Sequence, residues 1–361
     1  MTKTTKKTST SIIIPYSERY LSTNDVRLEV LCEQIINEIQ CEILVCCSGR
    51  LKKSRDIWLE TNTNIKRTNI PAGKIFNQGL ARNNSSNISS CNYLFFLDVD
   101  LVCSPHINSH LIEFTSDMVI RPTQAFEMFP CLYLTKEETA RFDGDFQGCL
   151  ESFLRGENHR VEGIALASSC LLMNREWFLQ LGGFDEQFVG HGGEDLELID
   201  RLTRHYPIGP RPDDYALNAK AQHPGDYQGF RRYFSYYALP HLFAGRFLVH
   251  QWHPRPLTHP YHKRRAGNDQ LLEQMLSRSE AERGPLKGPV VPCNDLNGEL
   301  PDFREWMIRL QEEAGYPVSE YPGLLRWQDG ITLRRPLWRK VRKLYLNPRA
   351  FFRDMFKPTS R

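Results

Sequence analysis

The sequence has no long uninterrupted run of apolar residues. No stretch of its 361 residues approaches the roughly 18 that a membrane-spanning helix needs. The N-terminal MTKTTKKTSTS is polar and basic, and no apolar signal-peptide segment follows it, so we expect no export signal. The ten cysteines lack zinc-binding spacing, and this indicates reduced thiols in a cytoplasmic protein rather than a zinc module.

Two further absences narrow the choice of fold. The sequence has no internal repeat, which excludes a solenoid or propeller built from repeated units. It also has no GxGxxG after its first apolar segment, which argues against a dinucleotide-binding fold. With 40% hydrophobic and 25% charged residues, the chain has the composition of an ordinary globular protein, and its length allows a large domain with an extension.

Strand and helix signals alternate through the first hundred residues. Short apolar runs predict strands at Ser11–Pro15, Glu42–Cys47 and Tyr93–Leu97, the first of them stopped by its proline, and Ile65–Ile70 is expected as a further strand. Apolar residues at helical spacing over 28–39 predict one helix between them. Lys74–Ser90 predicts a second, which the Asn/Ser run after Asn83 should fray. This alternation is typical of an α/β fold with a doubly wound, mostly parallel sheet and helices on both faces.

The pattern changes after residue 100. Further strands are predicted at Met118–Arg121, Ala165–Met173 and Arg246–Trp252, and a helix is predicted to begin at Glu194. We expect a disordered basic N-terminus at 1–10, the α/β domain at 11–265, a helical and irregular extension at 266–330 and a basic tail at 331–361.

Two carboxylates follow the predicted strand at Tyr93–Leu97, in the sequence YLFFLDVDLVC. Asp98 and Asp100 are one residue apart, and side chains alternate along a strand, so both point to the same side. Charged groups are almost never buried without a partner, so the pair indicates a bound cation or the rim of a crevice. Open α/β sheets bind ligands at this end of their strands, although many such acidic pairs are solvated turns.

The last segment differs from the rest in charge. Residues 331–361 hold ten Lys or Arg and a single acid, Asp354, whereas the whole chain carries only +3. Their apolar side chains fall on one helical stripe, so we predict a basic amphipathic helix that binds an anionic membrane surface. A helix docked on its own domain is the alternative. Nucleic-acid binding is not expected, because no recognition motif accompanies the charge.

The order of the motifs resembles that of GT-A glycosyltransferases. The matching segments, spread over residues 11–265, are SIIIP, EILVCC, GLARN, FLDVD and GGFDEQFVGHGGEDLELIDRL. The likeness is greatest to bacterial capsule-type transferases, chondroitin-polymerase catalytic modules, and the C-terminal motif of β-1,4-galactosyltransferases and polypeptide GalNAc-transferases. It implies a GT-A fold, which is a Rossmann-like doubly wound α/β sheet, here with a C-terminal helical extension.

The resemblance implies a divalent metal at the DxD motif, Mn²⁺ or Mg²⁺. Asp100 would be the stronger ligand, and Asp98 would contact the metal or the ribose of a nucleotide sugar. The family adds a histidine downstream of the GGED helix. The candidates are His223, His250 and His253, and we favour the last two because they close a better strand. An imidazole ligand favours Mn²⁺ over Mg²⁺.

The resemblance also assigns donor, acceptor and catalytic roles. Asp195 would be the general base and Glu194 would orient the acceptor, although acids in the first turn of a helix are also favoured by the helix dipole. Acceptor binding would further involve His191, Gly192 and Gly193, with His191 where many relatives carry Trp. Donor binding would involve Pro15, Tyr16, Arg19, Arg82, Asn83, Asp98 and Asp100.

Taken together, these features predict a metal-dependent inverting glycosyltransferase. It would transfer a hexose or N-acetylhexosamine from a nucleotide sugar, expected to be a UDP-sugar, to a growing capsular or surface polysaccharide. The acceptor would be an oligosaccharide or a lipid-linked glycan, and the enzyme would act in the cytoplasm at the inner face of the cytoplasmic membrane. The alternative is a non-catalytic subunit of a polysaccharide assembly complex that binds nucleotide sugars or glycans.

Truncation before Leu333 is expected to leave the catalytic domain folded and to release it from anionic vesicles. Each Lys or Arg near such a surface contributes about 1 kcal/mol, and the attraction fades over a Debye length of about 8 Å at physiological salt. Co-sedimentation with vesicles over a salt series should therefore show steep loss of binding for the full chain, with a remnant due to Trp338 and the nearby phenylalanines. Equal sedimentation of both proteins, or an insoluble truncated protein, would favour the docked helix.

Overall fold

The computed structural model describes most of the chain: residues 6–18, 24–116, 118, 120–255, 259–286 and 288–328, with 341, 344, 345, 348, 351 and 352. Arg19, expected at the donor site, lies outside the described residues, as does most of the basic tail at 331–361. Within the described part, no helix is long and apolar enough to cross a bilayer.

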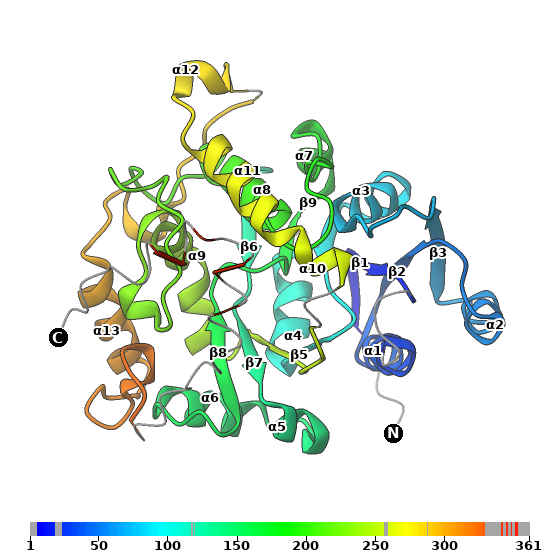
Figure 1. Ribbon diagram of the computed structural model, residues 1–361, viewed down its shortest axis with the longest axis horizontal. Helices are drawn as coiled ribbons and strands as arrows, with labels where there is room; N and C mark the ends of the chain where they lie inside the picture. Colours follow the sequence, from blue (N-terminus) through cyan, green and yellow to red (C-terminus); the bar gives the residue numbers. More distant parts are fainter. Residues whose placement is uncertain are drawn as a thin grey trace.

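A six-stranded sheet with the order β3-β2-β1-β4-β9-β6 forms the centre of the fold (Figure 1). Its strands span Lys6–Tyr16 (β1), Ile39–Ser48 (β2), Ile65–Ile70 (β3), Tyr93–Phe96 (β4), Phe126–Met128 (β6) and Leu171–Asn174 (β9). β1 to β4 are mutually parallel, and β9 and β6 are each antiparallel to the strand before them in the order. The mostly parallel sheet is therefore confirmed. The winding direction changes between β1 and β4, and ligand sites form at the carboxyl ends of strands beside such a point.

Helices cover both faces of this sheet. The flanking helices span Asn24–Glu38 (α1), Lys53–Thr61 (α2), Gln78–Ile88 (α3), Pro105–Phe114 (α4), Arg175–Gln180 (α7) and Glu194–His205 (α8). Ile12 and Ile14 of β1 face a core shared with α1, α2 and α4, whereas Ile13, with the opposite orientation, faces a core shared with α7 and α8. Figure 1 shows α1 and α3 on opposite sides of β1 and β2. The doubly wound arrangement follows from this alternation along the strand.

A second, four-stranded sheet was not predicted from the sequence. Its order is β5-β10-β7-β8, with bounds Leu101–Cys103 (β5), Cys131–Leu134 (β7), Val161–Ala165 (β8) and Leu248–His250 (β10). β5 follows the Asp98–Asp100 turn directly and pairs antiparallel with β10, in a register that places His250 opposite Leu101. The backbone N–H of Gln251 donates to the carbonyl of Asp100 at 2.8 Å, which extends this pairing to the acidic turn.

The first strand is longer than predicted at both ends. β1 begins at Lys6, so residues 6–10 are strand rather than part of a disordered N-terminus. It also continues through Pro15, although proline has no N–H to donate to a sheet. Pairing with β4 ends at Ile13, so the missing donor of Pro15 leaves no gap on that side.

Three other predicted elements are corrected by side-chain interactions. The segment Ala165–Met173 forms parts of two strands, β8 and β9, because Ser168 Oγ donates to the carbonyl of Phe129 and accepts from the N–H of Cys170, which turns the chain. Within the predicted strand Met118–Arg121, the described residues Met118, Ile120 and Arg121 are not in a strand, and Met118 is 93% exposed. Helix α3 does not fray after Asn83 but continues to Ile88, because the serines in its second half are buried and hydrogen bonded.

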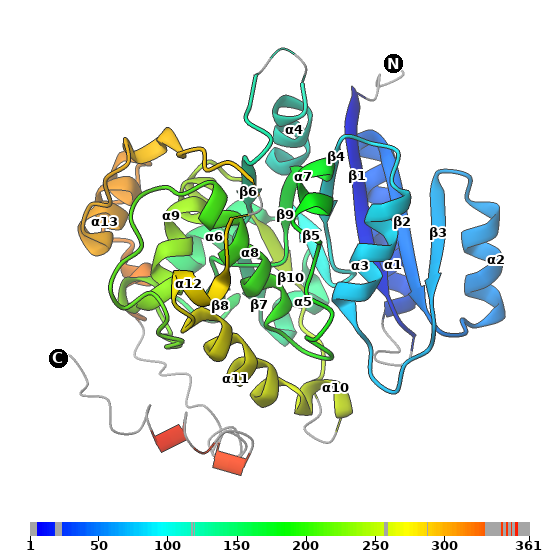
Figure 2. The same cartoon turned by 90° about the horizontal axis from the view of Figure 1, so that it is seen from above.

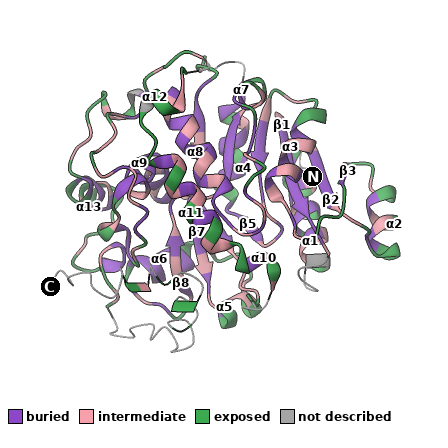
Figure 3. Cartoon of the chain, turned by 45° about the horizontal axis from the view of Figure 1, so that its top comes forward, coloured by how far each residue is buried: buried purple, intermediate pink, exposed green. Residues whose placement is uncertain are grey.

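The C-terminal part of the described chain shares the main core. The remaining helices are Lys136–Arg141 (α5), Phe146–Leu154 (α6), Gly229–Phe243 (α9), Pro260–Lys263 (α10), Arg265–Leu276 (α11), Glu280–Arg283 (α12) and Phe303–Glu313 (α13). Leu272 of α11 and Met307 of α13 are fully buried in the same cluster as Ile13. Figure 2 shows α10 and α11 along one edge of the molecule, and Figure 3 shows the buried residues concentrated on the central strands. Helices α11 and α13, within the part expected as an extension, thus pack into the body of the fold.

Candidate functional site

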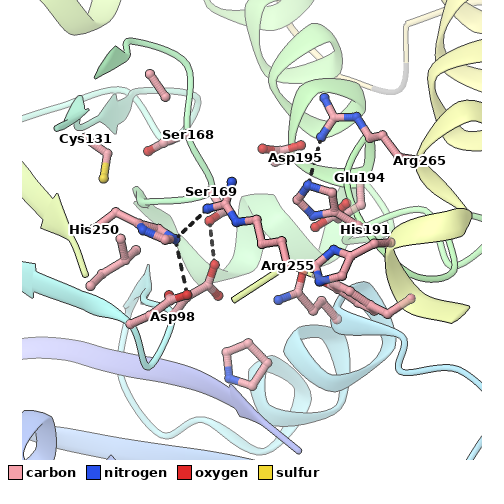
Figure 4. Close-up of a pocket in the computed structure, with 18 of the residues that line it drawn as sticks. Asp98, Cys131, Ser168, Ser169, His191, Glu194, Asp195, His250, Arg255 and Arg265 are labelled. Atoms are coloured by element: carbon pink, nitrogen blue, oxygen red, sulfur yellow. Dashed lines mark hydrogen bonds and ion pairs between the residues drawn. The ribbon is translucent and has the colours of Figure 1, made fainter. Parts of the chain in front are cut away.

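A cavity of about 360 Å³ opens at the carboxyl ends of β1 and β4, between the two sheets (Figure 4). Its lining is rich in groups that ionise or form hydrogen bonds: Asp98, Asp100, Ser168, Ser169, His191, Glu194, Asp195, Arg231, His250, His253, Arg255 and Arg265. The cavity therefore lies where the sheet topology places a ligand site, and it collects residues from β5, β10, α8, α9 and α11 or the turns beside them.

Asp100, His250 and His253 form a group with the geometry of a metal site. The Nε2 atoms of the two histidines lie 3.2 and 3.1 Å from Oδ2 of Asp100, and the three ligand atoms lie within 4.8 Å of one another. Burial by itself would raise the pKa of Asp100, but the two imidazoles hold this pKa well below its usual value. One carboxylate with two imidazoles suits Mn²⁺ better than Mg²⁺, so these residues fit the expected metal.

The third candidate histidine lies elsewhere. His223 is buried, with its Nδ1 3.0 Å from the carbonyl of Gly323, and it does not line the cavity. Within the residues that the structure describes, His250 and His253 are the histidines that join Asp100, because antiparallel pairing of β10 with β5 carries them there.

Asp98 is held by different partners from those of Asp100. Its Oδ1 accepts a hydrogen bond of 2.7 Å from Nη2 of Arg82, and its Oδ2 accepts one of 3.2 Å from Oγ of Ser169. Both acids line one cavity, as expected, but β4 ends at Phe96 and Val99 between them lines the cavity too, so a turn and not strand alternation brings them together. Only Asp100 belongs to the group with histidines, so the structure favours Asp98 as a neighbour of the metal group rather than a member.

Arg82, expected at the donor site, is not among the residues that line the cavity. It is fully buried and joins two carboxylates, with Nη2 2.7 Å from Asp98 and Nη1 3.4 Å from Glu194. Its guanidinium carbon lies 5.0 Å from the ring centre of Phe184. Burial lowers the pKa of Arg82, but the two acids more than offset this, and the net pKa is raised. Arg82 is thus a positioning residue between the acidic turn and α8.

Two further donor-site expectations are also corrected. Asn83 is occupied with the backbone of Phe184: its Nδ2 donates to the carbonyl at 2.9 Å, and its Oδ1 accepts from the N–H at 2.8 Å. It therefore anchors the GGFDE segment and does not line the cavity. Tyr16 is buried in the core, whereas its neighbour Pro15 does line the cavity.

Glu194 and Asp195 begin α8 but have different surroundings. Glu194 is 4% exposed, and its Oε2 has no hydrogen-bond partner among the described residues. Burial, with the nearby charge of Asp195, raises the pKa of Glu194 to about 7, although Arg82 opposes the shift. Asp195 lines the cavity, its Oδ1 accepts from the N–H of Leu196, and it forms no ion pair within the described part of the chain. Asp195 is thus the better placed of the two to accept a proton from a ligand.

The glycines before α8 are required by backbone geometry. Gly192 and Gly193 have φ values of 80° and 106°, in the region that L side chains rarely adopt. A Cβ atom on Gly192 would lie 2.3 Å from Nη1 of Arg265, and one on Gly193 would lie 2.7 Å from the ring of Phe188. These glycines let the chain turn tightly enough to present Asp195 to the cavity.

His191 forms part of the cavity wall beside Arg265. Its Nε2 lies 3.3 Å from Nη1 of Arg265, and its carbonyl accepts from Nδ2 of Asn268. Burial, together with the adjacent guanidinium, lowers the pKa of His191 well below its usual value, so the ring is neutral and accepts from the arginine.

Sequence patterns did not identify three arginines of the cavity. Arg231, Arg255 and Arg265 come from α9, the segment after β10 and α11. Arg255 was the most accessible to prediction, because it follows His253 by two residues; its Nη2 lies 3.2 Å from Nε2 of His250. The other two carry no motif and reach the cavity through helix packing alone.

A second group, of two histidines and one acid, has a structural role. Glu127 lies between His241, whose Nε2 is 2.5 Å from Oε2, and His110, whose Nε2 is 3.7 Å from Oε1. Arg246 donates to Nδ1 of His110 at 2.8 Å, so the neutral ring carries its proton on Nε2 and cannot offer a lone pair there. Burial would raise the pKa of Glu127, but the two imidazoles lower it below its usual range. This group connects α4, β6 and α9 as a buried charge network.

Glu127→Gln is expected to destabilise the protein by about 1–3 kcal/mol, because the two imidazoles would lose their charged acceptor. The exposed Glu137→Gln on α5 is the matched control and should change stability by less than about 0.5 kcal/mol. The depressed pKa means that Glu127 contributes its stability above the unfolded value of about 4.3 and loses it as the pH falls further. Urea unfolding at several pH values should therefore show the difference between variant and wild type narrowing in acid. A difference independent of pH would contradict the role of its charge.

Asp100→Asn and His253→Gln are each expected to weaken Mn²⁺ binding by about tenfold or more, because each removes a ligand from the group. Isothermal titration with Mn²⁺ measures this without any substrate. His159→Gln replaces an exposed histidine far from the group in the sequence and serves as the control. Wild-type affinity in the Asp100 variant would exclude this group as the metal site.

Comparison with known proteins identifies the family. A family model described as glycosyltransferase like family 2 matches residues 38–277, which is more than half of the chain. No curated protein sequence matches the chain.

Solved structures resemble the chain at low identity. The catalytic domain of Drosophila beta1,4-galactosyltransferase 7, in complex with xylobiose, is 17% identical with a TM-score of 0.28. The match covers 56% of this chain and 60% of that one, so it spans less than two thirds of the Drosophila domain. A mannosyltransferase from Pyrobaculum calidifontis, in complex with GDP-Man and Mn²⁺, is 14% identical with a TM-score of 0.39, and the match covers 97% of this chain and 88% of that one.

Proposed function

The chain belongs to the glycosyltransferase family 2-like proteins and has a GT-A-like fold, and we propose that it is a metal-dependent inverting transferase that uses a nucleotide-sugar donor. One observation carries the proposal. A single cavity holds the group Asp100, His250 and His253 and, separately, the carboxylate of Asp195 without an ion-pair partner in the described chain. This is the pairing of a cation site with a general base that glycosyl transfer from a diphosphate requires.

The donor is assigned to the side of the cavity near β1 and β4. A divalent cation bound by Asp100 and the two histidines would stabilise the negative charge that develops on the nucleoside diphosphate as it leaves. Arg255, beside His250, is placed to approach a phosphate oxygen, and Pro15 lines the end of β1 where the nucleoside would lie. The expected UDP-sugar, carrying a hexose or N-acetylhexosamine, belongs to this proposal.

The acceptor is assigned to the side of the cavity near α8. Asp195 would take the proton of the attacking hydroxyl while the new bond forms between that oxygen and the anomeric carbon. The bond from the anomeric carbon to the phosphate oxygen breaks at the same time, and its electron pair leaves with the diphosphate. Attack and departure on opposite faces invert the anomeric configuration. Glu194, held by Arg82, would support the acid beside it rather than act as the base.

The wider setting of the reaction follows from the motif order and the basic tail. We propose a capsular or surface polysaccharide as the growing product, with an oligosaccharide or lipid-linked glycan as acceptor. The tail at 331–361 would hold the enzyme at the inner face of the cytoplasmic membrane. A non-catalytic sugar-binding subunit is the less favoured reading, because such a role does not require Asp195 beside the metal group.

A donor screen is the direct test. Purified protein with Mn²⁺ and a panel of UDP-hexoses, UDP-N-acetylhexosamines and GDP-mannose should slowly hydrolyse one donor, and EDTA should stop the reaction. With that donor and an acceptor, Asp195→Asn should retain nucleotide binding but lower transfer by about 100- to 10,000-fold, whereas the exposed Asp213→Asn should not. Loss in Glu194→Gln but not in Asp195→Asn would exchange the two roles. Nucleotide binding without turnover of any donor would instead favour the binding subunit.

A further inference from the structure

Two arginines of the cavity lining, Arg231 and Arg255, form no ion pair within the described chain, and Arg255 contacts His250 instead. Arg231 comes from the first turn of α9, and its Nη2 donates to Oδ1 of Asn218 at 3.1 Å. Its Nε is buried and has no hydrogen-bond partner among the described residues, and it forms no ion pair with them. Arg231 as a whole is half-buried, and withdrawing part of a guanidinium from water without a carboxylate is costly. An arginine in this state at a cavity wall indicates an anion that the protein itself does not supply.

The surroundings of Arg231 increase the local positive charge. Arg265 also lines the cavity and pairs through Nε with Oδ1 of Asp269 at 2.9 Å. The other oxygen of Asp269 is taken by Nζ of Lys220, also at 2.9 Å. One carboxylate therefore serves two cations, and Arg231 adds a third positive charge close by. Burial and the adjacent Arg265 both lower the pKa of Arg231, which is the effect of cations packed together.

Other arginines of the fold are paired in two different ways. Arg232, the next residue along α9, pairs with Asp214 at 2.7 Å, and Arg283 pairs with Asp200 at 2.7 Å. Buried Arg82 has two acids. Arg175 and Arg246 show the other arrangement, in which a structural guanidinium contacts backbone carbonyls or an imidazole instead of a carboxylate. Arg231 differs from both in lying at the cavity wall.

The position of this charge separates it from the metal group. Figure 4 shows His250 on one side of the pocket, and Arg265 with Asp195 on the other. A donor diphosphate held at Asp100 and the histidines would occupy the first side, where Arg255 already supplies a guanidinium. Arg231 and Arg265 instead flank the carboxylate proposed to receive the proton of the acceptor hydroxyl.

We infer that Arg231 and Arg265 form a subsite for a negatively charged group on the acceptor, so that the enzyme extends an anionic glycan rather than a neutral one. This inference rests on the proposed function. The shared chemistry is an oxyanion within reach of two guanidinium groups, and it is either the carboxylate of a hexuronic acid or a phosphate ester on the acceptor. Arginine suits both, because its planar fork donates two parallel hydrogen bonds.

Matched acceptors test the inference on the full-length wild-type protein with Mn²⁺ and the donor it hydrolyses. The set comprises a disaccharide ending in a hexuronic acid, the same disaccharide ending in the neutral hexose, and the neutral compound with a phosphate ester. The KM for an anionic acceptor is expected to be about 10- to 100-fold lower than the KM for the neutral one. The reason is that only the anionic acceptor forms charge-assisted hydrogen bonds with the two arginines. Which anionic acceptor is preferred identifies the carboxylate or the phosphate as the source.

Variants of α9 connect that selectivity to Arg231. Arg231→Gln is expected to raise the KM for the anionic acceptor and to leave the KM for the neutral one within about twofold, which removes most of the selectivity. Arg231→Lys should restore part of it, because the charge remains but the fork is lost. Arg232→Gln removes the same charge from the same helix, away from the cavity lining, and should retain full selectivity.

Two results would overturn the subsite alone. They are equal use of neutral and anionic acceptors by the wild type, and loss of both acceptors in equal proportion in Arg231→Gln. Failure of the wild type to hydrolyse any donor would overturn the proposed function and, with it, the subsite. Donor hydrolysis without acceptor is therefore measured first, so that the two failures are told apart.

Discussion

The buried guanidinium of Arg82 is the contact on which the arrangement of the site depends. It reaches Asp98 in the turn after β4 and Glu194 at the start of α8, and it lies over the ring of Phe184. Removing a full charge from water costs several kcal/mol, and only close carboxylates offset such a cost. The acidic turn and the first turn of α8 must therefore lie on either side of this side chain. The spacing between the metal group and Asp195 follows from that constraint.

Much of the fold could be predicted from local patterns. Apolar runs located β1, β2 and β4, and the alternation of strands with helical segments indicated the parallel order. β3 is an edge strand with exposed polar residues, so its signal was weaker. The second sheet was not predictable in this way. Its strands are only three to five residues long and come from segments far apart in the chain. β10 lies within the strand predicted at Arg246–Trp252, but β5 and β7 carry too little periodicity to be identified, and the pairing of the four strands has no local signal. The turn at Ser168 was missed for a related reason, since two serine hydrogen bonds interrupt an otherwise apolar run.

The residues of the candidate site also fall into two groups, those that local sequence patterns identified and those that they did not. Asp100, Glu194 and Asp195 were identifiable because they follow strong elements in motifs with defined spacing, and the two histidines because they end a short strand. Arg82 and Asn83 were recognised as site residues, but their contacts with other parts of the protein were not predicted. The sequence around a helix position does not indicate which distant residues pack against it. Arg231 and Arg265 lie on helices whose orientation depends on tertiary packing, so no local pattern points to the cavity.

The pairing of β5 with β10 makes the position of the metal-binding residues independent of the shape of the other half of the cavity. Backbone hydrogen bonds fix His250 against Asp100, whatever the length or sequence of the segment between the two strands. That long intervening segment contains α8 and α9, which supply Asp195 and Arg231. Insertions or substitutions in this segment can reshape one half of the cavity without moving the metal-binding residues, which the strand pairing holds in place. The architecture is in this sense modular. Directed evolution aimed at a new acceptor can be confined to the segment between β5 and β10, with the ends of the two strands left unchanged.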